Sequence, residues 1–131
     1  METVGLYMSA FWALCQIAAT VVLITVNRRA ANGRLPRNPS AGLRTAATMR
    51  SDRAWVAGHR AALRLTPLCL LVLAGTLTAL LVAALSASMG VAKGVGIGGL
   101  FAFVPLAIYS TVVANRAAKS ADENPEGRQQ G

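Results

Sequence analysis

The sequence predicts an all-α integral membrane protein with three transmembrane helices and a basic, partly helical cytoplasmic loop between the first and the second. Hydrophobic residues make up 54% of the 131 residues and charged residues only 14%, against about 25% charged in an ordinary soluble domain. Three runs, residues 3–26, 65–92 and 94–115, also contain no charged residue. Each exceeds the roughly 20 residues that a helix needs to cross the hydrocarbon of a bilayer.

These runs predict a single membrane domain over residues 1–116. We expect transmembrane helices over about 4–26, 65–88 and 94–115, with the loop over 27–64. The tail, residues 117–131, mixes charges of both signs with proline and glycine, and it is predicted to be disordered.

The segment 27–64, called the arginine loop below, holds nine of the thirteen basic residues of the chain. Its only acid is Asp52, so its formal charge of +8 equals the net charge of the whole protein. Basic loops stay on the cytoplasmic side, which predicts an N-terminus outside and a C-terminus inside. Anionic membrane lipids are the expected partners, and nucleic acid is not, because no soluble module surrounds the basic residues. The nine are Arg28, Arg29, Arg34, Arg37, Arg44, Arg50, Arg53, Arg60 and Arg64.

Neither a metal nor a cofactor is expected. Cys15 and Cys69 lie at different depths of two spanning runs, so we interpret them as packing residues and not as a disulfide. One histidine and two thiols give no metal-ligand spacing. No strand precedes the glycines between Gly94 and Gly99, so they do not form a nucleotide-binding loop.

Small residues at four-residue spacing let transmembrane helices approach closely. We predict that two such stripes pack against each other and that Gln16 forms a hydrogen bond between helices. The stripe of the second helix is Gly75, Ala79, Ala83 and Ala87, and the stripe of the third is Gly90, Gly94, Gly98 and Ala102.

Polar side chains in the arginine loop recur at helical spacing. After Gly42, a helix would place Arg44, Thr48, Asp52, Trp55 and His59 along one face. Asp52 would then pair with Arg44 or His59, and this pairing would raise the pKa of His59. The alternative is a loop that only sets topology, in which Trp55 is an interfacial anchor and His59 faces lipid headgroups.

This loop resembles the SdpI-like family of bacterial membrane proteins. The family pattern is a juxtamembrane P-x-N-x-x-x-G-x-R-T segment, followed by T, D, W and H-R at helical spacing and then by a transmembrane helix. The matching residues are Pro36, Asn38, Gly42, Arg44, Thr45, Thr48, Asp52, Trp55, His59 and Arg60. The chain departs from the pattern at Ala46 and Ala47, where a Pro-Trp pair often follows, so any contact of that tryptophan is missing here.

The resemblance implies a protein of the bacterial plasma membrane that gives immunity to a secreted, membrane-active killing peptide and signals by capturing a cytoplasmic repressor. The family's namesake has additional transmembrane helices, and this chain looks like the three-helix unit alone. The resemblance gives the binding role to Asn38, Gly42, Arg44, Thr45, Thr48, Asp52, Trp55, His59 and Arg60.

Two other function classes remain open. The chain could be an accessory subunit of a larger membrane complex that docks through its small-residue stripes. A membrane enzyme or transporter is the third class, with Asp52 and His59 as its only candidate residues. No nucleophile, metal cluster or cofactor motif accompanies them, and no carboxylate, lysine or histidine lies inside a spanning run. We therefore expect no enzymatic activity.

Overall fold

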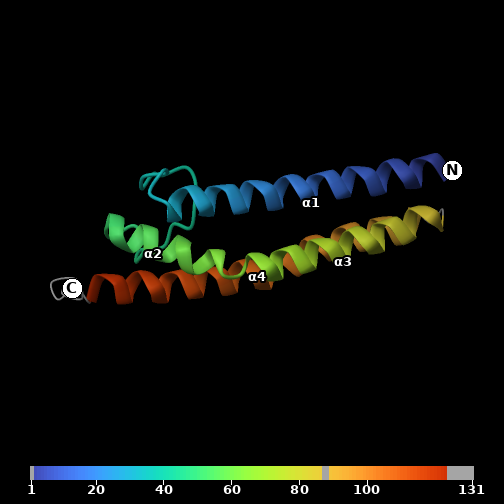
Figure 1. The fold of residues 1–131 in the computed structure, drawn as a ribbon. Helices are drawn as coiled ribbons and strands as arrows, with labels where there is room; N and C mark the ends of the chain where they lie inside the picture. The colour runs from blue at the N-terminus through green and yellow to red at the C-terminus, as the bar shows by residue number, and fades with distance from the viewer. Residues whose placement is uncertain (1, 87–88, 124–131) are drawn as a thin grey trace. The chain divides into compact units, whose positions relative to one another are not determined.

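The computed structural model describes residues 2–86 and 89–123, and four helices account for most of these ranges (Figure 1). They are α1 (Glu2–Ala31), α2 (Asp52–Leu63), α3 (Thr66–Leu85) and α4 (Met89–Glu123). Within the described ranges there is no strand. Of these helices, α1, α3 and α4 are long and apolar enough to cross a membrane. The all-helical fold with three spans is therefore confirmed.

The first and last helices are longer than a bilayer requires. At 1.5 Å per residue, the 30 residues of α1 and the 35 residues of α4 extend roughly 45 and 52 Å. The hydrocarbon is only about 30 Å thick. Each of these helices therefore has turns outside the hydrocarbon that can support the arginine loop.

The end of the third span differs from the prediction. Because α4 continues to Glu123, residues 117–123 are helical, and their assignment to a disordered tail was wrong. Ala118 is fully buried in a cluster with Ala47 and Ala54, so burial against the arginine loop stabilises these extra turns. The rest of the predicted tail, residues 124–131, lies outside the described residues, as does Ala87 of the second stripe.

The chain forms two compact units. The first contains Met1–Val22 and Pro67–Leu106, and the second contains Leu23–Thr66 and Ala107–Gly131. The second unit holds the arginine loop and α2, together with the ends of α1 and α4.

In the first unit, α1 turns polar side chains inward. Ser9, Gln16 and Thr20 are buried, whereas Phe11 and Leu14 are exposed. This reversal suits a helix in lipid, where exposed apolar groups cost nothing and polar groups gain from internal partners. Gln16 Nε2 donates to the Gly96 carbonyl of α4 at 3.4 Å, which agrees with its predicted role.

The close approach between helices uses glycines other than those predicted. A Cβ added at Gly96 would lie 2.5 Å from Trp12 Cγ, and one added at Gly99 would lie 2.5 Å from Gln16 Nε2 and closer still to Thr76. A Cβ added at Gly75, Gly90, Gly94 or Gly98 would meet nothing within 4 Å.

The predicted packing of the two stripes was therefore wrong at these glycines. Ala83 is buried, but Ala79 is only partly buried and Ala102 is exposed. Small residues at four-residue spacing identify a helix face that permits close approach, but they do not show which helix, if any, packs against that face. Both cysteines are free; Cys69 is buried as predicted, but Cys15 is exposed.

The helix of the arginine loop starts later than predicted. Ser51 is its N-cap and accepts a hydrogen bond from the Ala54 N–H at 3.0 Å, so α2 begins at Asp52. Arg44 and Thr48 precede the helix, and the prediction of one helical face running from Arg44 to His59 was wrong. Threonine hydroxyls that bond nearby backbone compete with helix formation, and Thr48 makes such bonds.

Candidate functional site

The first part of the arginine loop is folded by the side chain of Asn38. Its Oδ1 accepts hydrogen bonds from the N–H groups of Ser40 and Ala41 at 3.0 and 2.8 Å, and its Nδ2 donates to the Pro36 carbonyl at 2.8 Å. Asparagine bonding of this kind replaces the backbone bonds of a regular element. Asn38 therefore has a structural role in this turn.

Gly42 lies at the centre of the folded loop. Its φ of +103° is in the region that L side chains rarely adopt. A Cβ at this position would lie 2.6 Å from His59 Nε2 and 2.8 Å from Trp55 Cη2. The next residue, Leu43, donates its N–H to His59 Nε2 at 2.9 Å. Glycine is needed here both for the turn and for the close contact with α2.

The protonation state of His59 follows from its two hydrogen bonds. Because Nε2 accepts from Leu43, Nδ1 carries the proton and donates to the Trp55 carbonyl at 2.8 Å. Burial lowers the pKa of His59 below its ordinary value of 6.5, and the hydrogen bond to Trp55 opposes this only in part. The predicted increase in the pKa was wrong, because Asp52 does not face the imidazole. Asp52 instead pairs with Arg37, whose Nε lies 2.6 Å from Asp52 Oδ1.

Trp55 is an internal residue of the loop and not an interfacial anchor. It is 1% exposed, and its Nε1 donates to the Leu35 carbonyl at 2.9 Å. Its ring lies against the His59 imidazole, with centroids 4.2 Å apart. Trp55 thereby joins α2 to the segment that follows α1.

Two threonines close the second turn of the loop. Thr48 Oγ1 donates to the Leu43 carbonyl at 2.7 Å and accepts from the Thr45 N–H at 2.9 Å. Thr45 Oγ1 in turn accepts from the Thr48 N–H at 3.1 Å. Thr48 is completely buried beside Gly58 of α2, where an added Cβ would lie 2.8 Å from Thr48 Cγ2 and 3.1 Å from the Ala114 carbonyl of α4.

Several arginines of the loop have protein acceptors. Arg37 also donates to the Met49 carbonyl at 2.8 Å, Arg44 donates to the Pro39 carbonyl, and Arg60 donates to the Ala31 carbonyl at 3.4 Å. Arg50 lies 3.8 Å from Asp122 of α4. These four arginines contribute bonds to the fold as well as charge.

Sequence reasoning missed three residues that hold this unit together. Ser51 donates from Oγ to Asp122 Oδ1 at 2.6 Å, and Arg37 ties Asp52 to the loop. Ser51 can be recognised in the sequence, because a serine followed by an acidic residue in the first turn, here Asp52, is typical of a helix start. The role of Asp122 was not predicted, because residues 117–131 were assigned to a disordered tail.

The structure divides the predicted binding residues into two groups. Gly42, Thr48, Trp55 and His59 meet in the interior of the loop, and Asn38 and Thr45 support it. Arg44, Asp52 and Arg60 are exposed and do not meet one another. The interior group positions the loop, and the exposed group, although each member has a partner within the loop or at the end of α1, is accessible to another molecule.

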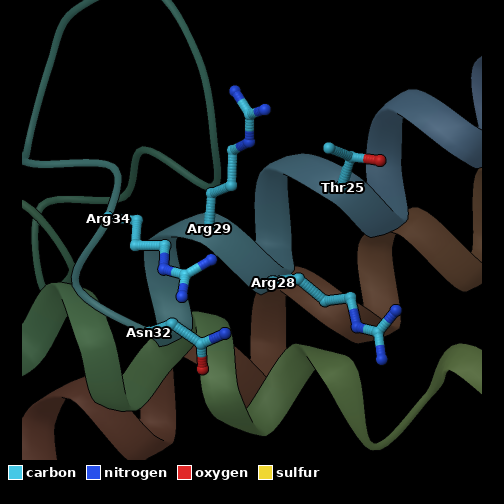
Figure 2. Close-up of a pocket in the computed structure, with 5 residues that line it drawn as sticks. All are labelled: Thr25, Arg28, Arg29, Asn32 and Arg34. Carbon is cyan, nitrogen blue, oxygen red and sulfur yellow. The ribbon is translucent and has the colours of Figure 1, made fainter.

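A basic pocket lies at the end of α1. It has a volume of about 340 Å³ and is lined by Thr25, Arg28, Arg29, Asn32 and Arg34 (Figure 2). All five side chains come from the last turns of α1 and the residues directly after it. No pocket was predicted here from the sequence, in which these arginines only add to the positive charge of the loop.

The stability of the folded loop should fall in mild acid. Neutral His59 is favoured in the folded loop, so its contribution is fully present above the unfolded pKa of 6.5 and is lost as the pH falls below it. In a Trp12→Phe background, quenching of Trp55 fluorescence by acrylamide should increase between about pH 7.5 and about pH 5.5. His59→Gln should flatten this dependence, and an equally steep profile in that variant would contradict the role of the imidazole.

The comparison with known families agrees with the pattern of the loop. The SdpI/YfhL protein family matches residues 34–113, which is more than half of the chain. The matched range contains most of the arginine loop, all of α2 and α3, and α4 as far as Val113. No curated protein and no solved structure matches the sequence. Together with the folded motif and the three membrane-spanning helices, this match shows that the chain belongs to the SdpI/YfhL family of membrane proteins.

Proposed function

We propose that the protein is a non-enzymatic immunity or signalling factor that binds its partner through the arginine loop on the cytoplasmic side of the membrane. Membership of the SdpI/YfhL family supports this proposal. The observation that carries it is the folded interior of the loop, where Thr48, Trp55 and His59 are at most 1% exposed. A loop that only sets topology needs positive charge and no such interior.

The exposed residues of the same motif provide the partner surface. Arg44 and Arg60 are exposed residues on a loop whose formal charge is +8, and each guanidinium group donates one hydrogen bond to a backbone carbonyl. Such a surface favours a partner with acidic groups, since charge complementarity determines both the association rate and the choice of partner. A cytoplasmic repressor with an acidic patch fits this surface. In signalling the bound partner would be this repressor, and in immunity it would be a membrane-active peptide.

Replacing Arg44 distinguishes a specific role of this motif residue from an effect of the net charge of the loop. Arg44→Ala should abolish capture of a cytoplasmic repressor in membrane co-purification and protection against a membrane-active peptide in growth assays. Arg53→Ala is the matched control, because Arg53 is also exposed, lies outside the motif and removes the same charge. Arg53→Ala should retain both activities. If the two variants behave alike, the loop acts only through its net charge.

The orientation of the arginine loop can be tested directly. A Ser40→Cys variant in a background with Cys15→Ala and Cys69→Ala should resist a membrane-impermeant maleimide in intact cells and react after permeabilisation. Ser40 is exposed, so its side chain does not limit the reaction. The charge of the loop favours the cytoplasmic side. Rapid labelling in intact cells would contradict this orientation.

A second candidate function is that of an accessory subunit in a larger membrane complex. One specific observation favours it: Gly90, Gly94, Gly98 and Ala102 are all exposed on α4, and no described residue lies within 4 Å of a Cβ added at the three glycines. A helix of another membrane protein could approach this stripe closely. The test is to purify the Gly98→Leu variant, in which the arginine loop is unchanged. If a membrane protein that co-purifies with the unmodified chain is lost from this variant, the accessory function is favoured over capture of a partner by the arginine loop.

A further inference from the structure

The basic pocket at the end of α1 has a composition that suits an anion. Three of its five lining residues are arginines, and the other two, Thr25 and Asn32, can also donate hydrogen bonds. Figure 2 shows that the guanidinium groups are spread around the end of the helix instead of meeting at one point. Four of the five residues precede position 34, where the family match begins, so the pocket is largely separate from the family motif.

The three pocket arginines have no acceptor among the described residues, a property that they share within the loop only with Arg53 and Arg64, which do not line the pocket. Arg37, Arg44, Arg50 and Arg60 each contact a carbonyl or a carboxylate. Within the described residues, the side chains of Arg28, Arg29 and Arg34 form no hydrogen bond and no ion pair. Two acids of this unit, Asp52 and Asp122, are engaged by other residues, and Glu123, the remaining described acid, forms no ion pair with the pocket arginines. Three neighbouring positive charges therefore have no counter-charge among residues 2–86 and 89–123.

The backbone places these arginines next to one another. After α1 ends, the chain folds back, and Arg34 donates its N–H to the Arg29 carbonyl at 2.8 Å. Gly33, with φ of +70°, permits this reversal. The C-terminal end of a helix carries only about half of a negative charge. Asn32, Gly33 and Leu35 also bond to the last carbonyls of α1, so this partial charge does not offset three arginines.

We propose that this pocket binds a phosphate group. Guanidinium binds phosphate through two parallel charge-assisted hydrogen bonds, which makes arginine well suited to this ligand. A volume of about 340 Å³ is near the lower end of the range for ligand pockets, which suits a headgroup or an inorganic ion. The candidate membrane span Thr3–Ala31 ends at the pocket, so the phosphate of an anionic lipid could reach it from the bilayer surface. This proposal is independent of partner capture by the family motif.

The test uses the purified full-length protein in a neutral detergent. Radiolabelled phosphatidic acid is titrated in mixed micelles, with phosphatidylcholine as the neutral lipid and inorganic phosphate as a soluble competitor. A variant with Arg28→Gln, Arg29→Gln and Arg34→Gln should lose at least about tenfold in phosphatidic acid affinity, since several charge-assisted bonds are removed. The matched control carries Arg53→Gln, Arg64→Gln and Arg116→Gln, which removes the same charge from exposed positions, and should lose less than about twofold.

A single conservative variant controls for the possibility that the triple variant misfolds. Arg34→Lys keeps the charge but loses the planar fork, so it should weaken phosphatidic acid binding several-fold while Trp55 remains shielded from acrylamide. Competition by millimolar inorganic phosphate would identify the free ion as a ligand, and its absence would identify the lipid headgroup. Equal losses in the two triple variants, or no loss in either of them, would overturn the proposal.

Discussion

Gly42→Ala should unfold the arginine loop locally while leaving the membrane-spanning helices in place. Alanine at a φ of +103° is strained, and left-handed backbone costs a residue with a Cβ about 1–2 kcal/mol. The added Cβ would also lie 2.6 Å from His59 Nε2, so either the imidazole must shift or the hydrogen bond from Leu43 must break. Overpacking of this kind typically costs about 1–3 kcal/mol. Together these effects give a destabilisation of about 3 kcal/mol.

Trypsin cleavage can measure this local opening, because the loop is rich in arginine. At about 1.4 kcal/mol per factor of ten, the open population should rise roughly a hundredfold, and the rate of cleavage within the loop should follow it. Gly33→Ala is the matched control. Gly33 also has a positive φ, +70°, but an added Cβ would meet nothing within 4 Å. It should show only the backbone cost, of about 1 kcal/mol, and equal cleavage of the two variants would refute the contact of Gly42 with α2.

The features that sequence predicted well are those that depend on composition over many residues. Three charge-free runs were enough to predict α1, α3 and α4, because the bilayer imposes a length and a polarity on any helix that crosses it. The motif residues of the arginine loop were identified by their resemblance to the SdpI-like family, and the family match confirms the family. Their roles could not be read from their spacing. Gly42 and Asn38 act through backbone turns that bring distant segments together, and helical periodicity does not describe such turns.

The features that sequence failed to predict depend on partners far along the chain. Residues 117–123 have little apolar surface, yet they are helical because Ala118 is buried by the loop and Asp122 accepts from Ser51, which lies 71 positions earlier. His59 was expected beside a carboxylate, but it lies beside the Leu43 N–H and the Trp55 carbonyl, which reverses the direction of its pKa shift. Glycine packing likewise depends on the bulk of Trp12 and Gln16, both on another helix.

Substitutions on α4 should separate the predicted glycine face from the observed one. Gly96→Ala and Gly99→Ala should each destabilise the first unit by about 1–3 kcal/mol, because the new methyl group would clash with Trp12 in one case and with Gln16 and Thr76 in the other. Gly98→Ala is the control in the same helix, and it should be neutral or slightly stabilising, since nothing lies within 4 Å of the added Cβ. The measurement is thermal unfolding of the purified protein in detergent, followed by helical circular dichroism. Destabilisation by Gly98→Ala with normal stability of Gly99→Ala would show that the stripes pack as the four-residue spacing suggests. Destabilisation confined to Gly96→Ala and Gly99→Ala would show that α4 approaches its neighbours through these two glycines, leaving the stripe at Gly98 free for a helix of another molecule.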